Sequence, residues 1–558
     1  MSYDTKTMKK SKCIKRAAIT GIALGIAIAV FAQFPQFFGR QMPGGGRGFP
    51  GMGHQMPGGP GHGQMPEGAM PGFGGMPGFG GTPGFGDMGD MGGMFQMNAS
   101  EGPELKSKVD FKSSNLPIIK IDTKGQSITT NGKITATMQI IDNGSDKRNN
   151  ISDKATGYDG QIGIKLRGNS SVSFEQKRYT IETRGESGKD IDVSLLGMPA
   201  ESDWVLLAPY NDISMLRDIL AFSLWNQMGH WGPHTRLCEL TMNGSYRGVY
   251  ILAETIKRSP NRLDIAKLRK DDVSGREVTG GYILRIDAVD GDELTFRSTV
   301  RGVGNGMMGQ NVTWTVYSPK KEKIAEEQLT YIQDYIGQTE KSIQNSSYSD
   351  KDKGYAKYIN IPSFVDYFIH TEVSLNADGL KRSAYFHKKK QNEDGTGGKL
   401  NAGPVWDYNL AFGNCSFCNA GNIKAWVYDG CETNPTPAMW KRLSQDPGFM
   451  ALVKERYSEL RKGILSNESL FKFIDDYAEL LSEAQERHFT QFSDLLQTEP
   501  QEEGSAAMPW FMPMGGGMGG NGLGWFSAYT VSSYQEEIAT LKQWLSDRLA
   551  FLDANWLR

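Results

Sequence analysis

Between residues 105 and 185 the chain carries short runs of apolar and β-branched residues, bounded by Gly and Asn turns. Residues 116–122 and 133–141 are rich in Ile and Thr, and the segment 161–167 alternates apolar and polar positions, with 178–183 as a candidate pairing partner. Runs of this length and pattern are typical of strands. We therefore expect this part of the chain to be mostly β-structure.

Beyond residue 185 the spacing of apolar residues along the chain changes. From Ser214 apolar residues recur at helix spacing, and residues 236–242 and 248–254 flank an Asn243-Gly244 pair, which is a strong hairpin signal. The other predicted elements are strands at 281–287 and 312–317, a helix at 320–343, a helix from Pro362 that ends at 376–379, a hairpin of 383–387 and 399–406, and a mainly helical region from Ala438 that ends in an amphipathic helix at 538–552.

This order of elements predicts an α+β fold, because hairpins dominate and no βαβ alternation is present. The sequence contains neither a Walker A motif nor a Gly-x-Gly-x-x-Gly that opens a helix. A P-loop enzyme and a dinucleotide-dependent dehydrogenase are therefore excluded.

The N-terminal segment, residues 1–39, has the layout of a secretory signal or a membrane anchor. Six Lys and Arg residues between Lys6 and Arg16 precede an uncharged, mainly apolar run at 17–34. Val30-Phe31-Ala32 provides small residues at plausible cleavage positions. The positive-inside rule then places the rest of the chain outside the cytoplasm, so we expect a membrane-anchored or secreted protein.

Residues 40–104 are expected to form a disordered stalk. Repeats such as MPGFGG make this tract rich in Gly, Pro and Met and poor in the branched apolar residues that build a core. A second Met- and Gly-rich tract lies at 506–525. We expect a β-rich N-terminal region at 105–160 and the main domain at 161–558.

The charge and the cysteine content limit which partners and ligands are expected. The 61 basic and 63 acidic residues nearly cancel, so no nucleic-acid partner is expected. Cys415, Cys418 and Cys431 are clustered. Outside the cytoplasm a disulfide within this trio is the favoured interpretation, since a zinc site needs further ligands that the sequence does not offer.

Two aspartates stand out as candidate chemistry. Asp378 follows a predicted helix and Asp407 ends the predicted hairpin after it. The order helix, Asp loop, hairpin, Asp is the chain order of the catalytic and metal-binding segments of protein kinases. Asp-Gly is also a common turn pair and Asp407 could cap a turn, so the pair alone leaves the function open.

Further segments make the hypothesis more specific. They are LRGNSS at 166–171 with Lys177 and Tyr179 downstream, Leu216-Arg217, Asn243-Gly244 before 248–254, and WDYNLAFG at 406–413. In this order and spacing they resemble the CotH spore-coat kinase family over residues 115–555. The resemblance implies an atypical, secretory-kinase-like protein kinase fold that uses ATP and Mg²⁺ or Mn²⁺ to phosphorylate Ser or Thr hydroxyls of a protein substrate.

The resemblance also assigns roles. Asp378 matches the catalytic aspartate that receives or orients the substrate hydroxyl proton, and Asp407, with Asn409, matches the metal-binding position. Lys177 is the expected phosphate-contacting lysine. Glu254 is expected to be either the partner of Lys177 or a second acidic ligand.

Arg167 is expected to add positive charge near the phosphates. Alternatives from the residues themselves are an ordinary turn at 166–171, a solvated Lys177, and a Glu254 that pairs with Lys257 or Arg258.

Two departures from the kinase pattern keep a second class of function open. Ser383 stands five residues after Asp378, where a metal-binding Asn is expected, and Asn409 stands where family members often carry a second Asp. ATP is also scarce outside cells. The alternatives are a catalytically silent surface or spore-coat protein that keeps the fold for binding, and a transferase that moves AMP instead of phosphate.

Overall fold

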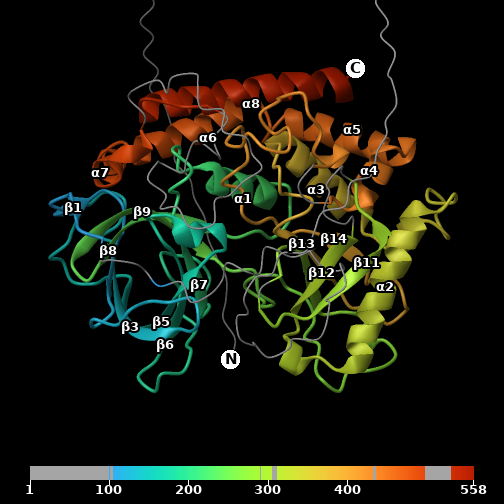
Figure 1. The fold of residues 1–558 in the computed structure, drawn as a ribbon, viewed down its shortest axis with the longest axis horizontal. Coiled ribbons are helices and arrows are strands. Elements are labelled where there is room, and N and C mark those ends of the chain that lie inside the picture. The colour runs from blue at the N-terminus through green and yellow to red at the C-terminus, as the bar shows by residue number, and fades with distance from the viewer. Residues whose placement is uncertain (1–99, 101–104, 290, 304–310, 432–434, 497–528) are drawn as a thin grey trace, which may run out of the picture. The chain divides into compact units, whose positions relative to one another are not determined.

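Seven strands close into a barrel in the computed structural model, in the order β2-β3-β5-β6-β7-β9-β8 (Figure 1). The structure describes residues 100, 105–289, 291–303, 311–431, 435–496 and 529–558. The barrel strands are β2 (Ile118–Asp122), β3 (Ile134–Ile141), β5 (Tyr158–Arg167), β6 (Arg178–Arg184), β7 (Asp203–Leu207), β8 (Thr235–Met242) and β9 (Ser245–Glu254), beside the short pair β1 (Ser113–Ser114) and β4 (Asn149–Asn150).

Every second side chain along these strands points into the barrel, and these side chains fill its interior. Ile162, Ile164 and Leu166 of β5 point inward with Tyr179 and Ile181 of β6, and all five are fully buried or nearly so. A strand turns alternate side chains to opposite faces, so the residues between them face outward. The four strands expected before residue 185 are confirmed.

The β8–β9 hairpin is confirmed as well. Asn243 and Gly244 both have positive φ values, 52° and 81°. The favoured two-residue hairpin turn requires this conformation at both positions, and Asn and Gly adopt it most readily. The turn therefore fixes where β9 begins and which of its residues face the barrel.

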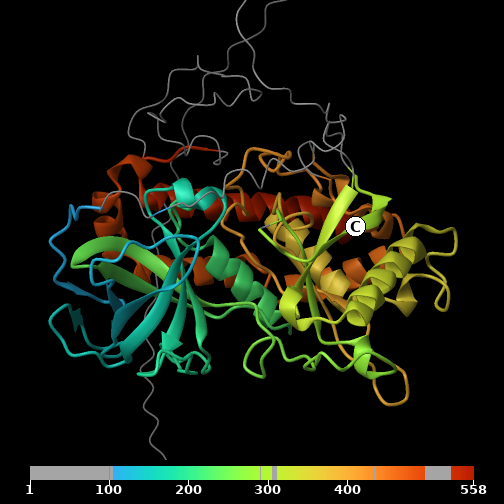
Figure 2. The ribbon, with the colours of Figure 1, turned by 60° about the horizontal axis from the view of Figure 1, so that its bottom comes forward.

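A second sheet has the strand order β11-β12-β10-β13-β14 and is antiparallel throughout (Figure 2). In it Ile286 of β10 pairs with Ala384 of β13, so the residues just outside this pair, Asp287 and Ser383, lie together. The strands are β10 (Tyr282–Ile286), β11 (Thr295–Arg301), β12 (Asn311–Ser318), β13 (Ala384–Lys388) and β14 (Leu400–Ala402).

Most helices follow the second sheet in sequence, and α8 packs along α5 and α6 (Figure 1). Ser533 caps α8 by accepting from Glu536 N, and the expected apolar stripe at 538–552 is mostly buried. The helices are α1 (Arg217–Gln227), α2 (Glu326–Gln344), α3 (Ile361–Ser374), α4 (Ala438–Ser444), α5 (Pro447–Arg461), α6 (Asn467–Leu480), α7 (Ala484–Gln491) and α8 (Tyr534–Trp556).

The α+β class and the β-rich first part followed by a helical second part are thus confirmed. Two boundaries differ from expectation. The helix expected from residue 320 begins at Glu326, after a separate 3₁₀ turn at Lys321–Lys323. The strand expected over 399–406 pairs only from Leu400 to Ala402, since Pro404 has no N–H to donate.

Several sequence predictions lie outside the described residues: the anchor segment 1–39, all of the stalk except Ser100 within residues 40–104, and the tract at 506–525. In the part of the chain that the structure describes, no helix has the length and apolar character to cross a membrane.

Candidate active site

Two arginines face each other at the end of the barrel. Arg167 closes β5, Arg178 opens β6, and the two residues are direct partners in the antiparallel register. The chain between them contains a 3₁₀ turn at Ser170–Ser173 and begins at Gly168, whose φ of +118° favours glycine. The LRGNSS segment is therefore part of a long connection that holds two cations at its ends, and it is not a tight hairpin turn.

Arg178 forms an ion pair with Asp407. Its Nη1 donates to Asp407 Oδ1 at 3.1 Å, and the Arg178 side chain is 10% exposed while that of Asp407 is 41% exposed. Next to Asp407, the Trp406 ring lies under the Arg167 guanidinium, with 4.8 Å between the guanidinium carbon and the ring centroid. The structure thus places Arg167 and Arg178 beside the Trp406-Asp407 segment.

Asn409 lies beside this pair. In the amide orientation that satisfies both of its polar atoms, its nitrogen donates to Asp407 Oδ1 at 3.0 Å and its oxygen accepts from Arg178 Nη2 at 3.3 Å. The amide oxygen, the atom that a metal would need, is therefore engaged by Arg178.

Asp218 from the first turn of α1 adds a second carboxyl. Its Oδ1 accepts from the backbone N–H of Tyr408 at 2.6 Å, and its side chain is buried. Burial, with a smaller effect from the negative charge of Asp407, raises the pKa of Asp218 to about 7 against the opposing effect of Arg178.

Asp287 contributes a third carboxyl from the second sheet. Ser383 Oγ donates to Asp287 Oδ2 at 3.3 Å, and Arg285 Nη1 lies 3.6 Å from the same oxygen. Burial raises the pKa of Asp287, and Asp407 contributes in the same direction. Ser383, at the position of the expected metal-binding Asn, thus holds a carboxylate from another strand.

Asp378 lies in the loop after α3, where Leu375 has a left-handed conformation that ends the helix. Lys381 Nζ donates to Asp378 Oδ1 at 3.2 Å and to Ala377 O at 2.6 Å, so the carboxylate has a fixed cation beside it. The loop is tied to the Asp407 segment through Phe412 N, which donates to Ser374 O at 2.7 Å. The two aspartate segments therefore pack together.

Arg217 holds the Asp407 segment from the opposite side. This fully buried residue donates from Nε to Ala411 O at 3.1 Å and from Nη1 to Asp212 and Glu537. The bond to Glu537 connects α1 with α8. A guanidinium with two carboxylates and a carbonyl has its charge compensated, so the segment after Asp407 has a rigid support.

Lys177 and Glu254 lie elsewhere. Lys177 Nζ donates to Val172 O at 2.8 Å and so braces the connection between β5 and β6. Glu254 is fully buried and binds Arg262 and His234. The roles of Lys177 and Glu254 toward a nucleotide stay predictions.

The alternative pairing of Glu254 with Lys257 is wrong. Lys257 binds Glu201 and Asp203 instead, at 2.9 and 2.7 Å.

Sequence reasoning missed Arg178, Asp218 and Asp287. For Arg178 the sequence offered a signal. Tyr179 is expected to face the core, and Arg178, the residue before it on the same strand, must therefore face the opposite side. Asp218 and Asp287 offered no such signal, because each is one polar residue at the end of an element. Only the pairing of β10 with β13 and the packing of α1 bring them to Asp407.

The cysteine trio contains the expected disulfide, between Cys418 and Cys431, and Cys415 is a buried free thiol. Lys381 Nζ lies 3.3 Å from Cys418 Sγ, so the disulfide supports the Asp378 loop. Over the described ranges, no group of three or more His, Cys, Asp or Glu residues is arranged to hold a metal ion.

A β-rich part is thus followed by a helical part, and the Asp378 and Asp407 segments are joined by the bond from Phe412 N to Ser374 O. Residues 164–552 match the family model described as CotH kinase protein, and the chain therefore belongs to this family. The match begins within β5 and ends within α8, so it includes β6 to β9 of the barrel, the second sheet and α1 to α7. Comparison with curated proteins gave no match.

Proposed function

We propose that the protein is an ATP-dependent protein kinase that transfers the γ-phosphoryl group to Ser or Thr hydroxyls with Mg²⁺ or Mn²⁺. The observation that carries this proposal is the Arg178–Asp407 ion pair, set opposite Arg167 and beside the Asp378 loop. Phosphoryl transfer depends on positioning and on charge stabilisation. Cations for the phosphates, a carboxylate for the metal and a carboxylate for the hydroxyl are the groups that it requires.

The donor set suits a divalent cation. Mg²⁺ and Mn²⁺ prefer carboxylate oxygens. Burial raises the pKa of both Asp218 and Asp287, and the nearby Asp407 carboxylate adds to both shifts. We assign Asp407 as the principal ligand, with Asn409 beside it. A metal held there would supply positive charge that neutralises the phosphates.

The chain's own residues supply the rest. Arg178 and Arg167 bind phosphate oxygens from the end of the barrel, and Arg178 leaves Asp407 to do so. Asp378 orients the substrate hydroxyl and accepts its proton, and Lys381 keeps the carboxylate in place. The disulfide-supported loop limits movement of Asp378.

A second candidate function is binding without catalysis, as in a surface or spore-coat structural protein. The Asn409 amide favours it, because the atom that faces Asp407 is a donor and the amide oxygen is engaged by Arg178. We also propose an extracytoplasmic location, membrane attachment through residues 1–39, and, for the kinase, a substrate on the cell surface or spore coat. These proposals rest on the N-terminal sequence and on family membership.

The deciding experiment uses purified protein, Mn²⁺ and ATP labelled either on the γ-phosphate or on the adenine. Label from the γ-phosphate on protein Ser or Thr, lost in Asp407→Ala and kept in Asp476→Ala, supports the kinase. Asp476 is a matched control because it is an exposed helix residue paired with Lys472. Adenine label on protein indicates AMP transfer, and nucleotide binding without any label supports the silent protein. Absence of nucleotide binding overturns both enzyme proposals.

A further inference from the structure

A β-bulge in the β8–β9 hairpin gives Arg247 an unusual position. Leu240 pairs with Gly248 and Thr241 pairs with Tyr246, so Arg247 is the extra residue of β9. A bulge leaves its extra residue out of the ladder and redirects the side chain. Gly248, with a φ of +92°, permits the return to regular pairing.

The Arg247 side chain is a buried cation. The residue is only 5% exposed, its Nε has no hydrogen-bond partner, and within the described residues it takes part in no ion pair. An arginine is always protonated, and a buried charge is unfavourable unless it is paired. The other buried arginines among the described residues, namely Arg178, Arg217, Arg262 and Arg548, are each paired with a carboxylate.

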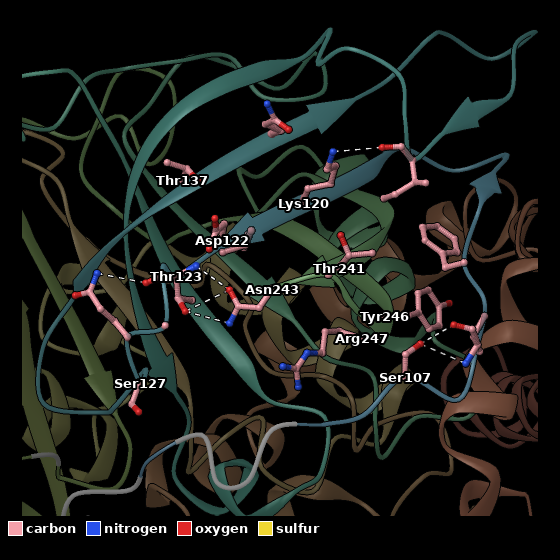
Figure 3. Close-up of a pocket in the computed structure, with 18 of the residues that line it drawn as sticks. Ser107, Lys120, Asp122, Thr123, Ser127, Thr137, Thr241, Asn243, Tyr246 and Arg247 are labelled. Atoms are coloured by element: carbon pink, nitrogen blue, oxygen red, sulfur yellow. Dashed lines mark hydrogen bonds between the residues drawn. The ribbon is translucent and has the colours of Figure 1, made fainter.

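Arg247 lines a pocket of about 1140 Å³ on the barrel, shown in Figure 3. Its side chain extends into the pocket from beside Thr241 and Asn243, while Lys120 lies on the far side and donates to Ile151 O at 3.2 Å. The described segment around Ser107 forms another wall. None of the residues placed in the candidate active site lines this pocket.

The remaining charges limit what the pocket accepts. Asp110, Asp122 and Asp159 are exposed in its lining, so a ligand with several negative charges would be repelled. Thr241 offers a hydroxyl group beside Arg247, whereas the Asn243 amide is bonded to Thr123. The lining therefore suits one anionic group on an otherwise neutral, polar molecule.

We propose that this pocket is a second ligand site and that Arg247 binds a single oxyanion group there, a carboxylate or a phosphate. The guanidinium fork matches both groups in a bidentate geometry. The bound anion supplies a counter-charge that Arg247 lacks among the described residues. The site is independent of phosphoryl transfer, because it shares no residue with the Arg178–Asp407 site.

The test measures the thermal unfolding midpoint of the full-length protein in acetate and in inorganic phosphate, against chloride at equal ionic strength. At about ten times the dissociation constant, the effective anion raises the midpoint by about 2 °C. Arg247→Met loses this rise and is at least as stable as the unaltered protein in chloride, because a buried unpaired cation has been removed. Acetate alone identifies a carboxylate ligand, and phosphate alone identifies a phosphate ligand.

Two control variants locate the effect. Arg236→Met, on the same hairpin but exposed and bonded only to backbone carbonyls, keeps the rise. Arg178→Met also keeps it, which separates this pocket from the candidate active site. The proposal is overturned if Arg247→Met responds to anions as the unaltered protein does, if Arg178→Met alone abolishes the response, or if neither anion has an effect.

Should Arg247→Met fail to fold, Thr241→Val replaces it. This variant keeps the guanidinium and removes the neighbouring hydroxyl, so the anion concentration for half of the rise should increase severalfold. An unchanged concentration dependence in Thr241→Val, together with an unchanged one in Arg247→Lys, overturns the proposal in that case.

Discussion

Arg178 Nη1 donates to Asp407 Oδ1 at 3.1 Å, and this contact joins residues 229 positions apart in the sequence. It connects the barrel with the segment that follows the second sheet. Because the Asp407 carboxylate is 41% exposed, a ligand can reach it from solvent. The pair is therefore both a structural link and the point where phosphate and metal would compete with an internal ion pair.

The first prediction compares the contribution of Arg178 to phosphoryl transfer with that of its neighbour Lys177. Arg178→Met should lower kcat/KM for γ-phosphoryl transfer by about 10²- to 10³-fold, the usual effect of removing a group that stabilises charge in the transition state. Lys177→Met should lower it by less than about tenfold, since Lys177 Nζ donates to Val172 O. Initial rates with γ-labelled ATP measure both variants. Equal losses in the two would show that Lys177 contacts the phosphates.

Most of the fold could be predicted from the sequence, because its elements are encoded by local sequence patterns. The Asn243-Gly244 turn, the alternation around Tyr179 and the stripe of α8 each predicted an element that the structure contains. The site was accessible only in part. Asp378 and Asp407 were found through chain order, whereas Asp287 depends on β10 pairing with β13, a contact that no local pattern encodes.

The second prediction concerns the pH dependence of stability. Because the pKa of Asp218 is raised from 3.8 to about 7, folded Asp218 keeps its proton between about pH 4 and 7, where the unfolded chain has lost it. Its contribution to stability is thus present below pH 4 and lost as the pH rises through 7. Asp218→Asn keeps an acceptor for Tyr408 N and removes the titration. Relative to the unaltered protein, its free energy of unfolding should increase above pH 7, by up to about 4 kcal/mol for three pKa units.

Urea unfolding at pH 4 and pH 8 measures this effect. The two proteins should differ little at pH 4 and most at pH 8. A difference that is the same at both pH values would show that Asp218 is ionised throughout this range.

The third prediction concerns the Cys418–Cys431 disulfide. It closes a loop with a sequence separation of 13, and a loop of this length contributes about 3 kcal/mol through the entropy of the unfolded chain. Cys431→Ala should therefore lower the free energy of unfolding by roughly this amount. Reducing agent should destabilise the unaltered protein and leave Cys431→Ala unchanged. Cys415→Ala, which removes a free thiol from the same region, should keep its sensitivity to the reducing agent.

The last prediction tests the departure at Ser383. This residue has a φ of +48°, in the left-handed region that Asn tolerates better than most residues. Ser383→Asn would place an amide oxygen where the kinase pattern has one, next to Asp287. We expect the Mn²⁺ concentration for half-maximal activity to fall by about tenfold, as for other changes in the surroundings of a metal.

Ser383→Ala is the matched control for that variant. It removes the hydroxyl that donates to Asp287 Oδ2, so the Mn²⁺ requirement should rise or stay the same. Titration of Mn²⁺ followed by electron paramagnetic resonance reports binding even where activity is low. If Ser383→Asn and Ser383→Ala bind Mn²⁺ equally, position 383 lies outside the metal site, and Asp407 must hold the metal without help from the Asp378 loop.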